Sequence, residues 1–226
     1  MRAKLVHRRF IADKTSEITL DLGEQDFSFK AGQYVYLCLP SLAHPDPRGK
    51  CREFSICSSP NEQGMIQTAF RHSESGFKRT LLGMPLGSAV DIDGPFGLFT
   101  IPKRRAAPVV LIAGGIGVTP FMSMIRVATE DKHSLRMLLI TSNTSIERAA
   151  FREELRLLAQ RNPHVTFREN IGHLTPEFIR SSVGDAAHPT YYLAGSPKMV
   201  HDIREALKGA GIDDDDILVE EFVGYA

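Results

Sequence analysis

Hydrophobic and polar residues alternate along the first hundred residues of the chain. Apolar positions at 18–22 alternate with polar ones, and the same period of two returns at 35–39 and 90–93. This period is typical of strands with one buried face. Glycine and proline separate the runs, and short strands at such spacing predict a small antiparallel barrel. One helix is expected within it, at 76–82.

Beyond residue 105 the pattern changes to continuous apolar runs separated by segments of helical period. An uninterrupted apolar run is typical of a strand buried on both faces. Alternation of such strands with helices implies a parallel sheet with right-handed crossovers. We expect strands at 108–113, 135–140, 191–194 and 217–221, and helices that begin near 120, 151 and 197. The stretch 103–108 is interpreted as the linker, so the chain divides into residues 1–102 and 103–226.

Composition narrows the classes of function. Lys and Arg number 27, as do Asp and Glu, so the formal charge is zero and no nucleic-acid partner is expected. No apolar run approaches the roughly 20 residues that a membrane span needs. Three cysteines are too few for an internal four-cysteine iron–sulfur cluster. Their odd number and the lack of a CxxC pair fit a reducing compartment. No metal site is expected, and without a signal-peptide core the chain is expected in the cytoplasm.

Glycines follow the first apolar run of the second half, in the segment 113–120 (AGGIGVTP). They let the backbone approach a ligand closely, while Thr119 can cap the following helix and Pro120 suits its first turn. Free backbone N–H groups and the helix dipole then favour a pyrophosphate. Because Pro120 stands where a dinucleotide fingerprint has its third glycine, a tight turn without a ligand is the alternative.

Three further segments carry candidate chemistry. In 52–55 (REFS) a guanidinium suits a phosphate oxygen, an aromatic ring suits a planar ligand and a hydroxyl suits a ring nitrogen. Taken alone, that segment is typical of an ordinary surface strand. Residues 192–199 repeat the pattern of strand, glycine turn and capped helix, at the edge where open α/β sheets bind ligands. The alternative is a plain strand–helix connection without a ligand. The tail 220–226 places aromatic residues after the last strand.

Together and in this order, the four segments resemble the ferredoxin–NADP reductase family of flavoproteins, over residues 5–226. The resemblance implies an antiparallel six-stranded Greek-key β-barrel that binds FAD. It also implies a following five-stranded α/β parallel-sheet domain that binds NADH or NADPH. Three positions depart from the family pattern. Phe54 stands where tyrosine is more common, Arg79 stands where serine is common, and Ala194 replaces a cysteine beside the hydride-transfer site.

The resemblance also assigns site residues. Those for FAD are Arg52 at the pyrophosphate, Phe54 against the isoalloxazine, Ser55 near flavin N5, Ala69, Phe70 and Arg71 on a lining strand, and Gly76, Phe77, Lys78 and Thr80 at a phosphate-binding helix. Those for the coenzyme are Gly115, Gly117, Thr119, Gly195 and Met199. The catalytic set is Ser55, Glu220 and Phe222, and the Phe222 ring is expected to cover the flavin face that nicotinamide must reach.

Coenzyme choice depends on the end of the strand at 135–140. No acid stands there to take a ribose 2′-hydroxyl, whereas Ser142 and Arg148 suit a 2′-phosphate and favour NADPH. Arg148 is equally suited to be a solvated helix residue, so NADH stays open.

These residues predict an FAD-dependent oxidoreductase that takes a hydride from NAD(P)H and passes electrons to a separate acceptor. The acceptor is a ferredoxin, a flavodoxin, an oxygenase or haem component, or a small molecule. The alternatives are a reductase subunit of a larger complex and a non-enzymatic flavin- or nucleotide-binding regulator.

Overall fold

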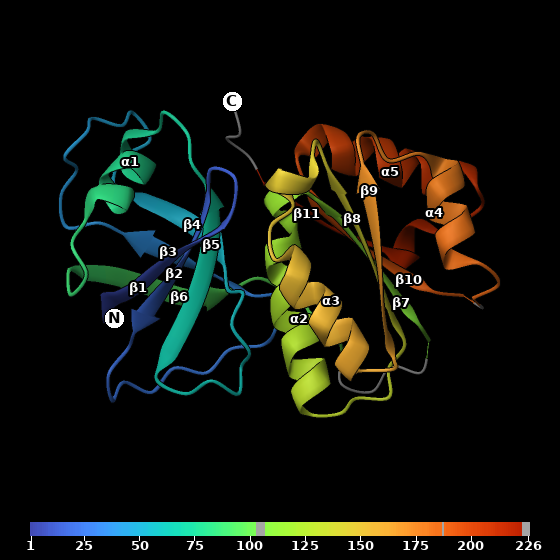
Figure 1. Ribbon diagram of the computed structural model, residues 1–226, viewed down its shortest axis with the longest axis horizontal. Helices are drawn as coiled ribbons and strands as arrows, with labels where there is room; N and C mark the ends of the chain where they lie inside the picture. Colours follow the sequence, from blue (N-terminus) through green and yellow to red (C-terminus); the bar gives the residue numbers. More distant parts are fainter. Residues whose placement is uncertain (103–106, 187, 223–226) are drawn as a thin grey trace.

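The computed structural model describes residues 1–102, 107–186 and 188–222. Figure 1 shows two lobes side by side, an antiparallel one from the first half of the chain and an α/β one from the second. The division expected after residue 102 adjoins the segment 103–106, which lies outside the described residues.

The first lobe is a closed antiparallel sheet. Among the described residues its elements are β1 (Arg2–Ala12), β2 (Thr15–Asp21), β3 (Tyr34–Cys38), β4 (Cys51–Ser55), β5 (Met65–Arg71), α1 (Gly76–Gly83) and β6 (Ala89–Phe96). The strand order is β4-β3-β6-β1-β2-β5. A bridge between Ile56 and Thr68 joins the chain after β4 to β5, which closes the sheet into a barrel. Alternate residues such as Val35 and Leu37 point into the core, as the period of two predicts.

The second lobe is a parallel sheet covered by helices on both faces. Its strands, in the described residues, are β7 (Val109–Gly114), β8 (Met137–Asn143), β9 (Val165–Ile171), β10 (Thr190–Gly195) and β11 (Ile217–Glu221), in the order β11-β10-β7-β8-β9. Helices α2 (Thr119–Glu130) and α3 (Arg152–Arg161) pack on one face, and α4 (Pro176–Val183) and α5 (Pro197–Gly209) on the other. No helix in the described part of the chain is long and apolar enough to cross a membrane.

The predicted fold is confirmed, and the boundaries of several elements differ for local reasons. The helix expected near 151 begins at Arg152, because Phe151 has a left-handed φ of 61°. Thr119 does not cap α2. A 3₁₀ turn, η1 (Gly115–Val118), precedes the helix, and the Thr119 hydroxyl donates to the carbonyl of Ile116. Strand β9 was not expected, because as an edge strand it exposes or half-exposes most of its residues and lacks an apolar run.

An apolar cluster joins the two lobes. Cys57, Ala69 and Phe99 of the first lobe pack with residues of β7, α2 and β10. The ring centroids of Phe99 and Tyr192 lie 5.4 Å apart, edge to face. The lobes therefore share part of one core.

A buried ionic network crosses the same seam. Arg126 of α2 is 6% exposed. Its guanidinium donates to the carbonyl of Cys57 (2.7 Å), to Gln67 Oε1 (2.8 Å) and to Glu154 Oε1 (2.7 Å). It also lies 3.4 Å from the carboxylate of Glu17 on β2, which is 1% exposed. The network thus ties α2, whose first turn follows the glycine loop, to the barrel wall.

The cysteines are not all free thiols. Strand register places Cys38 directly opposite Cys51, and the two form a disulfide that closes the loop between β3 and β4. They are 13 residues apart, so their spacing along the chain gave no sign of the pair. Cys57 keeps its thiol and is buried.

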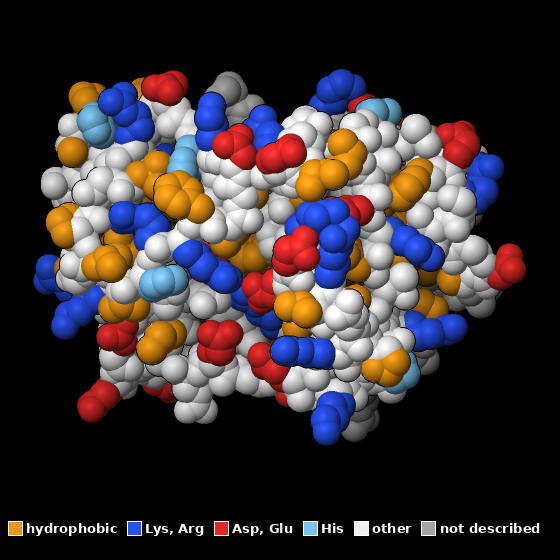
Figure 2. All heavy atoms as spheres, in the orientation of Figure 1, with side chains coloured by type: hydrophobic (Ala, Val, Ile, Leu, Met, Phe, Trp, Pro, Cys, Tyr) orange, Lys and Arg blue, Asp and Glu red, His pale blue; other side chains and the backbone are white. Residues whose placement is uncertain are grey.

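Surface charges of both signs are mixed on the face shown in Figure 2. Arg156 on α3, for example, pairs with Glu153 and Glu169. Exposed pairs of this kind contribute roughly 0–1 kcal/mol each. The side chain of Arg156 is 43% exposed, so a substitution of Arg156 is a suitable control for a substitution of the buried Arg126.

Candidate active site

A cleft of about 690 Å³ opens where the barrel meets the carboxyl edge of the parallel sheet. Its volume lies within the roughly 300–1,000 Å³ typical of small-molecule sites. Strands β4 and β5 and the start of α1 line it from the barrel. The start of α2 and the end of β11 line it from the second lobe. The cleft is therefore built by both lobes.

A hydrogen bond joins the two lobes inside this cleft. Ser55, at the end of β4, donates from Oγ to Glu220 Oε1 of β11 across 3.1 Å. Burial, together with a smaller effect of the Glu53 charge, raises the pKa of the Glu220 carboxyl from 4.5 to about 7, although the Ser55 hydrogen bond opposes the shift. Near neutral pH the Glu220 carboxyl can therefore either hold or accept a proton.

The other end of the cleft surrounds the first turn of α1. Asp46, in the β3–β4 loop, accepts hydrogen bonds from the backbone N–H of Phe77 (2.9 Å) and from Ser75 Oγ (2.6 Å). Its second oxygen pairs with Arg52 Nη2 at 2.5 Å. These bonds, the Phe77 bond first, hold the pKa of the Asp46 carboxyl well below its usual range. The turn expected to receive a phosphate thus already holds a carboxylate.

Positive charge gathers beside this carboxylate. Lys78 and Arg48 line the same cleft as Arg52. Burial, with smaller effects of the Arg48 and Arg52 charges, lowers the pKa of the Lys78 ammonium to about 8. A diphosphate bound beside these side chains would favour the charged form of Lys78.

Glycines bring the two nucleotide-side loops into contact. A Cβ on Gly117 would lie 2.2 Å from the carbonyl oxygen of Ala194, and one on Gly114 would lie 2.0 Å from Met199 Sδ. Real Cβ atoms essentially never approach this closely, so the backbone contact leaves no room for a side chain at Gly117. At Gly114 the neighbour is the flexible end of Met199, which would have to move. Packing between the glycine loop and the end of β10 therefore requires glycine at 117.

Unpartnered polar atoms lie at the end of β8. Thr141 Oγ1 and Asn143 Oδ1 are buried and have no hydrogen-bond partner among the described residues. Between them, Ser142 donates from Oγ to the carbonyl of Gly172 (2.8 Å). Buried polar atoms without partners are rare. A polar ligand at this edge, next to Gly114 in the strand register, would satisfy them.

Arg71 of β5 ties the lobes together next to the glycine loop. It donates to Thr15 Oγ1 (3.0 Å) within the barrel and to the carbonyl of Arg148 (2.8 Å) in the second lobe. A Cβ on Gly115 would lie 3.3 Å from its guanidinium. The structure thus places Arg71 at the seam and not in the lining of the cleft.

Comparison with known protein families identifies the class of protein to which this cleft belongs. The family model of the oxidoreductase FAD-binding domain matches residues 2–101, and that of the oxidoreductase NAD-binding domain matches residues 111–205. The chain belongs to the ferredoxin–NADP reductase-like family of flavoprotein oxidoreductases. FAD and either NADH or NADPH are the cofactors of this reductase.

Known reductases resemble the chain along most of its length. It is 27% identical to ferredoxin–NADP reductase B of Sorangium cellulosum over 92% of this chain and 91% of that protein. It is 26% identical to the phenol hydroxylase P5 protein of Acinetobacter pittii over 100% of this chain, but spans only 66% of that relative. The crystal structure of the Amycolatopsis cytochrome P450 reductase GcoB superposes with a TM-score of 0.83. At 23% identity, over 98% of this chain and 70% of that one, this likeness shows the shared fold.

The residues of the cleft fit FAD. Their polar groups combine the cations beside α1 with the part-buried hydroxyl–carboxyl pair of Ser55 and Glu220. The residues assigned from the sequence that do line the cleft are Arg52, Phe54, Ser55, Ala69, Phe70, Gly76, Lys78, Thr119, Glu220 and Phe222. Phe54 is 6% exposed and packs between the rings of Phe70 and Phe77 at centroid distances of 5.8 and 5.9 Å.

Other assigned residues lie outside the lining of this cleft: Arg71, Phe77, Thr80, Gly115, Gly117, Ser142, Arg148, Gly195 and Met199. Phe77 is buried in the barrel core, and the Thr80 hydroxyl donates to the carbonyl of Gly76 (2.7 Å). The structure shows these internal contacts, and the expected roles of both residues at a phosphate stay predictions.

Sequence reasoning missed several lining residues, chiefly Asp46 and Arg48 in the β3–β4 loop and Tyr34 and Tyr36 on β3. The loop reaches the cleft only because β3 and β4 are paired. The one signal in its sequence is a pair of charges set among prolines and a glycine, in PDPRG at 45–49.

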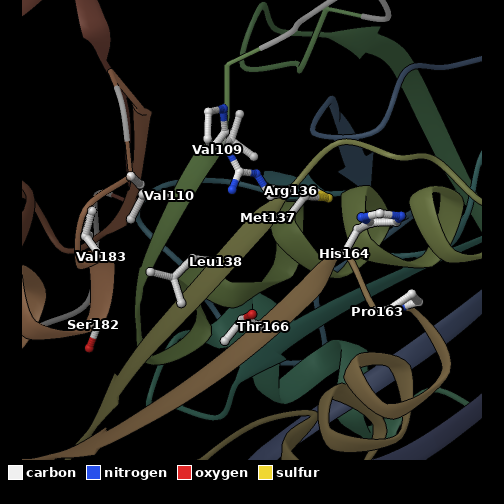
Figure 3. Close-up of a pocket in the computed structure, with 12 residues that line it drawn as sticks. Val109, Val110, Arg136, Met137, Leu138, Pro163, His164, Thr166, Ser182 and Val183 are labelled. Carbon is white, nitrogen blue, oxygen red and sulfur yellow. The ribbon is translucent and has the colours of Figure 1, made fainter.

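A second hollow, of about 210 Å³, lies at the opposite end of the parallel strands. Figure 3 shows mostly apolar side chains around it, from the starts of β7 and β8 and the end of α4. Arg136 and His164 are the ionisable residues labelled there. Because open α/β sheets bind ligands at the carboxyl ends of their strands, this hollow is not assigned to the reductase site.

Proposed function

We propose that this reductase takes a hydride from NADPH or NADH and passes the electrons to a separate acceptor. When bound, FAD supplies the redox chemistry, because its ring system accepts a hydride and can release electrons singly. The observation that carries the proposal is the 3.1 Å hydrogen bond between Ser55 and Glu220. This bond joins two residues from opposite lobes, both of which the family resemblance assigned to the catalytic set.

The protein's own part is to hold a proton and to cover the reacting ring. Ser55 Oγ donates a hydrogen bond to the Glu220 carboxyl, and near neutral pH that carboxyl can be protonated or ionised, so it can give or take a proton. The backbone N–H of Phe222 donates to the carbonyl of Gly195 (2.8 Å), which holds the chain after β11 against the cleft. The Phe222 ring packs partly against the shared core. We assign it to cover the flavin face and to yield to nicotinamide. The rest of the tail, 223–226, lies outside the described residues.

The names of the relatives support an oxygenase component or a haem protein as the acceptor. One relative is a phenol hydroxylase protein and one structural neighbour is a cytochrome P450 reductase. A ferredoxin is the alternative that the Sorangium cellulosum relative supports. A cytoplasmic location stays part of the proposal, and the redox state of Cys38 and Cys51 in cells tests it, because a reducing compartment would keep them as thiols.

The visible spectrum of the purified protein tests this function. We expect a flavin absorbance band that bleaches when NADPH or NADH is added without oxygen, and steady oxidation of the coenzyme when ferricyanide is supplied. Activity with ferricyanide alone would show that no partner subunit is required. A bound flavin that neither coenzyme reduces would contradict the proposal and would favour a binding regulator.

Coenzyme preference gives a separate prediction. If Arg148 binds a 2′-phosphate, Arg148→Ala should lower kcat/KM for NADPH by about 10-fold, since charge-assisted hydrogen bonds contribute roughly 1.5–3 kcal/mol. The value for NADH should stay the same. Steady-state kinetics with both coenzymes measures this, and Arg156→Ala on α3 is the matched control. An unchanged ratio would remove Arg148 from the coenzyme site.

A further inference from the structure

Three aromatic side chains form a cluster on the outer face of the barrel. The ring centroids of Tyr34 and Tyr36 on β3 lie 6.0 Å apart. The ring of Phe96 on β6 lies 6.0 Å from the Tyr34 ring and 5.7 Å from the Tyr36 ring. Tyr36 is 36% exposed and Phe96 is 38% exposed. Exposed apolar groups that gather in this way, unlike single ones, mark an interaction site.

The loop after β6 extends this cluster. A Cβ on Gly97 would lie 3.1 Å from the Tyr34 ring, so the backbone of the loop packs directly on that ring. Gln33 Nε2 donates to the carbonyl of Gly97 (3.2 Å) and holds the loop there. The next residue, Leu98, is 93% exposed, more than any other large hydrophobic residue in the described part of the chain. A fixed loop therefore presents this leucine to solvent beside the rings.

The cluster adjoins the end of the cleft where Ser55 and Glu220 meet. Tyr34 lies directly opposite Ser55 in the strand register, and both tyrosines of β3 line the cleft. Burial, with smaller effects of the Glu53 and Glu220 charges, raises the pKa of the Tyr34 hydroxyl, which shows that Tyr34 is within electrostatic reach of Glu220. A protein bound over the cluster would therefore lie next to the proposed site of hydride transfer. Electron transfer slows steeply with distance, so this is a favourable place for an acceptor.

Carboxylates flank the cluster. Glu53 on β4 and Asp93 on β6 lie on either side of Tyr36 in the sheet, and both are exposed. The Tyr36 hydroxyl donates to Glu53 Oε1 (2.5 Å) and fixes that carboxylate beside the rings. The cation on the neighbouring strand, Arg2 of β1, lies opposite Asp91 and not opposite Asp93. The apolar centre of this surface therefore has a negatively charged rim.

Charge selects the kind of partner that fits this surface. An apolar centre with an acidic rim complements a protein face that has an apolar centre and a basic rim. A second copy of this chain fits poorly, because the two-fold contact of a homodimer sets the same surface of each copy against the other. Glu53 and Asp93 would then face the same carboxylates, and like charges in an interface repel.

We propose that this surface binds an electron-acceptor protein whose docking face carries lysine or arginine side chains around an apolar patch. We call the surface the acceptor face, and its residues are Tyr34, Tyr36, Glu53, Asp93, Phe96 and Leu98. The inference rests on the proposed function, because it names an electron acceptor as the partner. It deepens that function by making the acceptor a protein and its docking face basic.

Two variants on the acceptor face and two matched controls test the proposal. Leu98→Ser and Asp93→Lys change residues outside the lining of the cleft. Leu157→Ser and Asp215→Lys make the same changes at exposed positions of the second lobe. The probe is cytochrome c, a basic haem protein, and calorimetry measures its Kd for the flavin-loaded reductase. At low ionic strength we expect each acceptor-face variant to bind about 10-fold more weakly and each control to stay within about 2-fold of the parent. Added salt should weaken binding to the parent more than binding to Asp93→Lys.

Each outcome bears on one of two conclusions. Unchanged binding in either acceptor-face variant would overturn the proposal, as would a parent that does not bind cytochrome c. A parent that sediments as a dimer and becomes a monomer in Leu98→Ser would also overturn it, because a second copy would then occupy the face. Anaerobic reduction of the flavin by NADPH or NADH should proceed at the same rate in all four variants. A parent whose flavin neither coenzyme reduces would refute the proposed function, and the binding measurements would still decide whether the acceptor face exists.

Discussion

Replacing Glu220 with glutamine should slow turnover by about 100-fold, because a positioned acid–base group commonly contributes 10²–10⁴-fold. Glutamine preserves the shape of the side chain and can still accept the Ser55 hydrogen bond, but it cannot exchange a proton. Ser55→Ala should fall in the same range, and the double variant should be little worse than either single one, since the two groups act as a unit. Coenzyme oxidation with ferricyanide measures all three.

The pH profile distinguishes a catalytic loss from a structural one. The parent should show an apparent pKa near 7 that is absent in Glu220→Gln. The folded pKa lies above the ordinary value of 4.5, so this group favours folding fully below about pH 4.5, and that contribution is lost as the pH rises through 7. Glu220→Gln should therefore melt no lower than the parent at pH 8. A variant that is inactive and also melts much lower would contradict the catalytic role.

Arg126→Met should lower the free energy of unfolding by about 3 kcal/mol. The substitution leaves Glu17 and Glu154 without their shared cation at a buried seam, and breaking a buried pair from one side costs roughly 3–5 kcal/mol. Arg9 also pairs with Glu17, which places the expected loss at the lower end of that range. For a chain of this size the melting temperature should fall by roughly 6–12 °C.

Urea unfolding gives the measurement, with Arg156→Met as the exposed arginine control, for which we expect less than about 0.5 kcal/mol. Combining Arg126→Met with Glu17→Gln should recover part of the loss, because no buried carboxylate then lacks its partner. If Arg126→Met unfolds at the same urea concentration as the parent, the network does not hold the lobes together.

The sequence was most informative where one periodicity extends over a whole element. The apolar runs that became β7 and β10 are buried on both faces, and the capped start of α5 at Ser196 is found where it was expected. The motif residues Ser55 and Glu220 were assigned by family resemblance and meet in the structure. No local sequence pattern predicts their contact, because the two residues are 165 positions apart.

The parts that could not be predicted depend on pairings between strands or lobes. Asp46 reaches α1 only because β3 and β4 bring their loop beside it, and the same register pairs Cys38 with Cys51. In the sequence, Arg126 is one charged residue on an amphipathic helix, and its partner Glu17 lies 109 residues earlier, on the barrel. Such contacts follow from how the strands pair and how the lobes dock, which local propensity does not encode.

Cys57 makes the seam measurable in solution. Its thiol is fully buried between the lobes, and burial together with the nearby Glu17 carboxylate raises the thiol pKa well above its usual value. An alkylating reagent reacts with the thiolate and can reach it only when the structure opens around Cys57. The labelling rate of this sulfur therefore reports how often the seam opens, by local or global unfolding. We expect bound coenzyme or acceptor that stabilises the closed seam to slow the labelling.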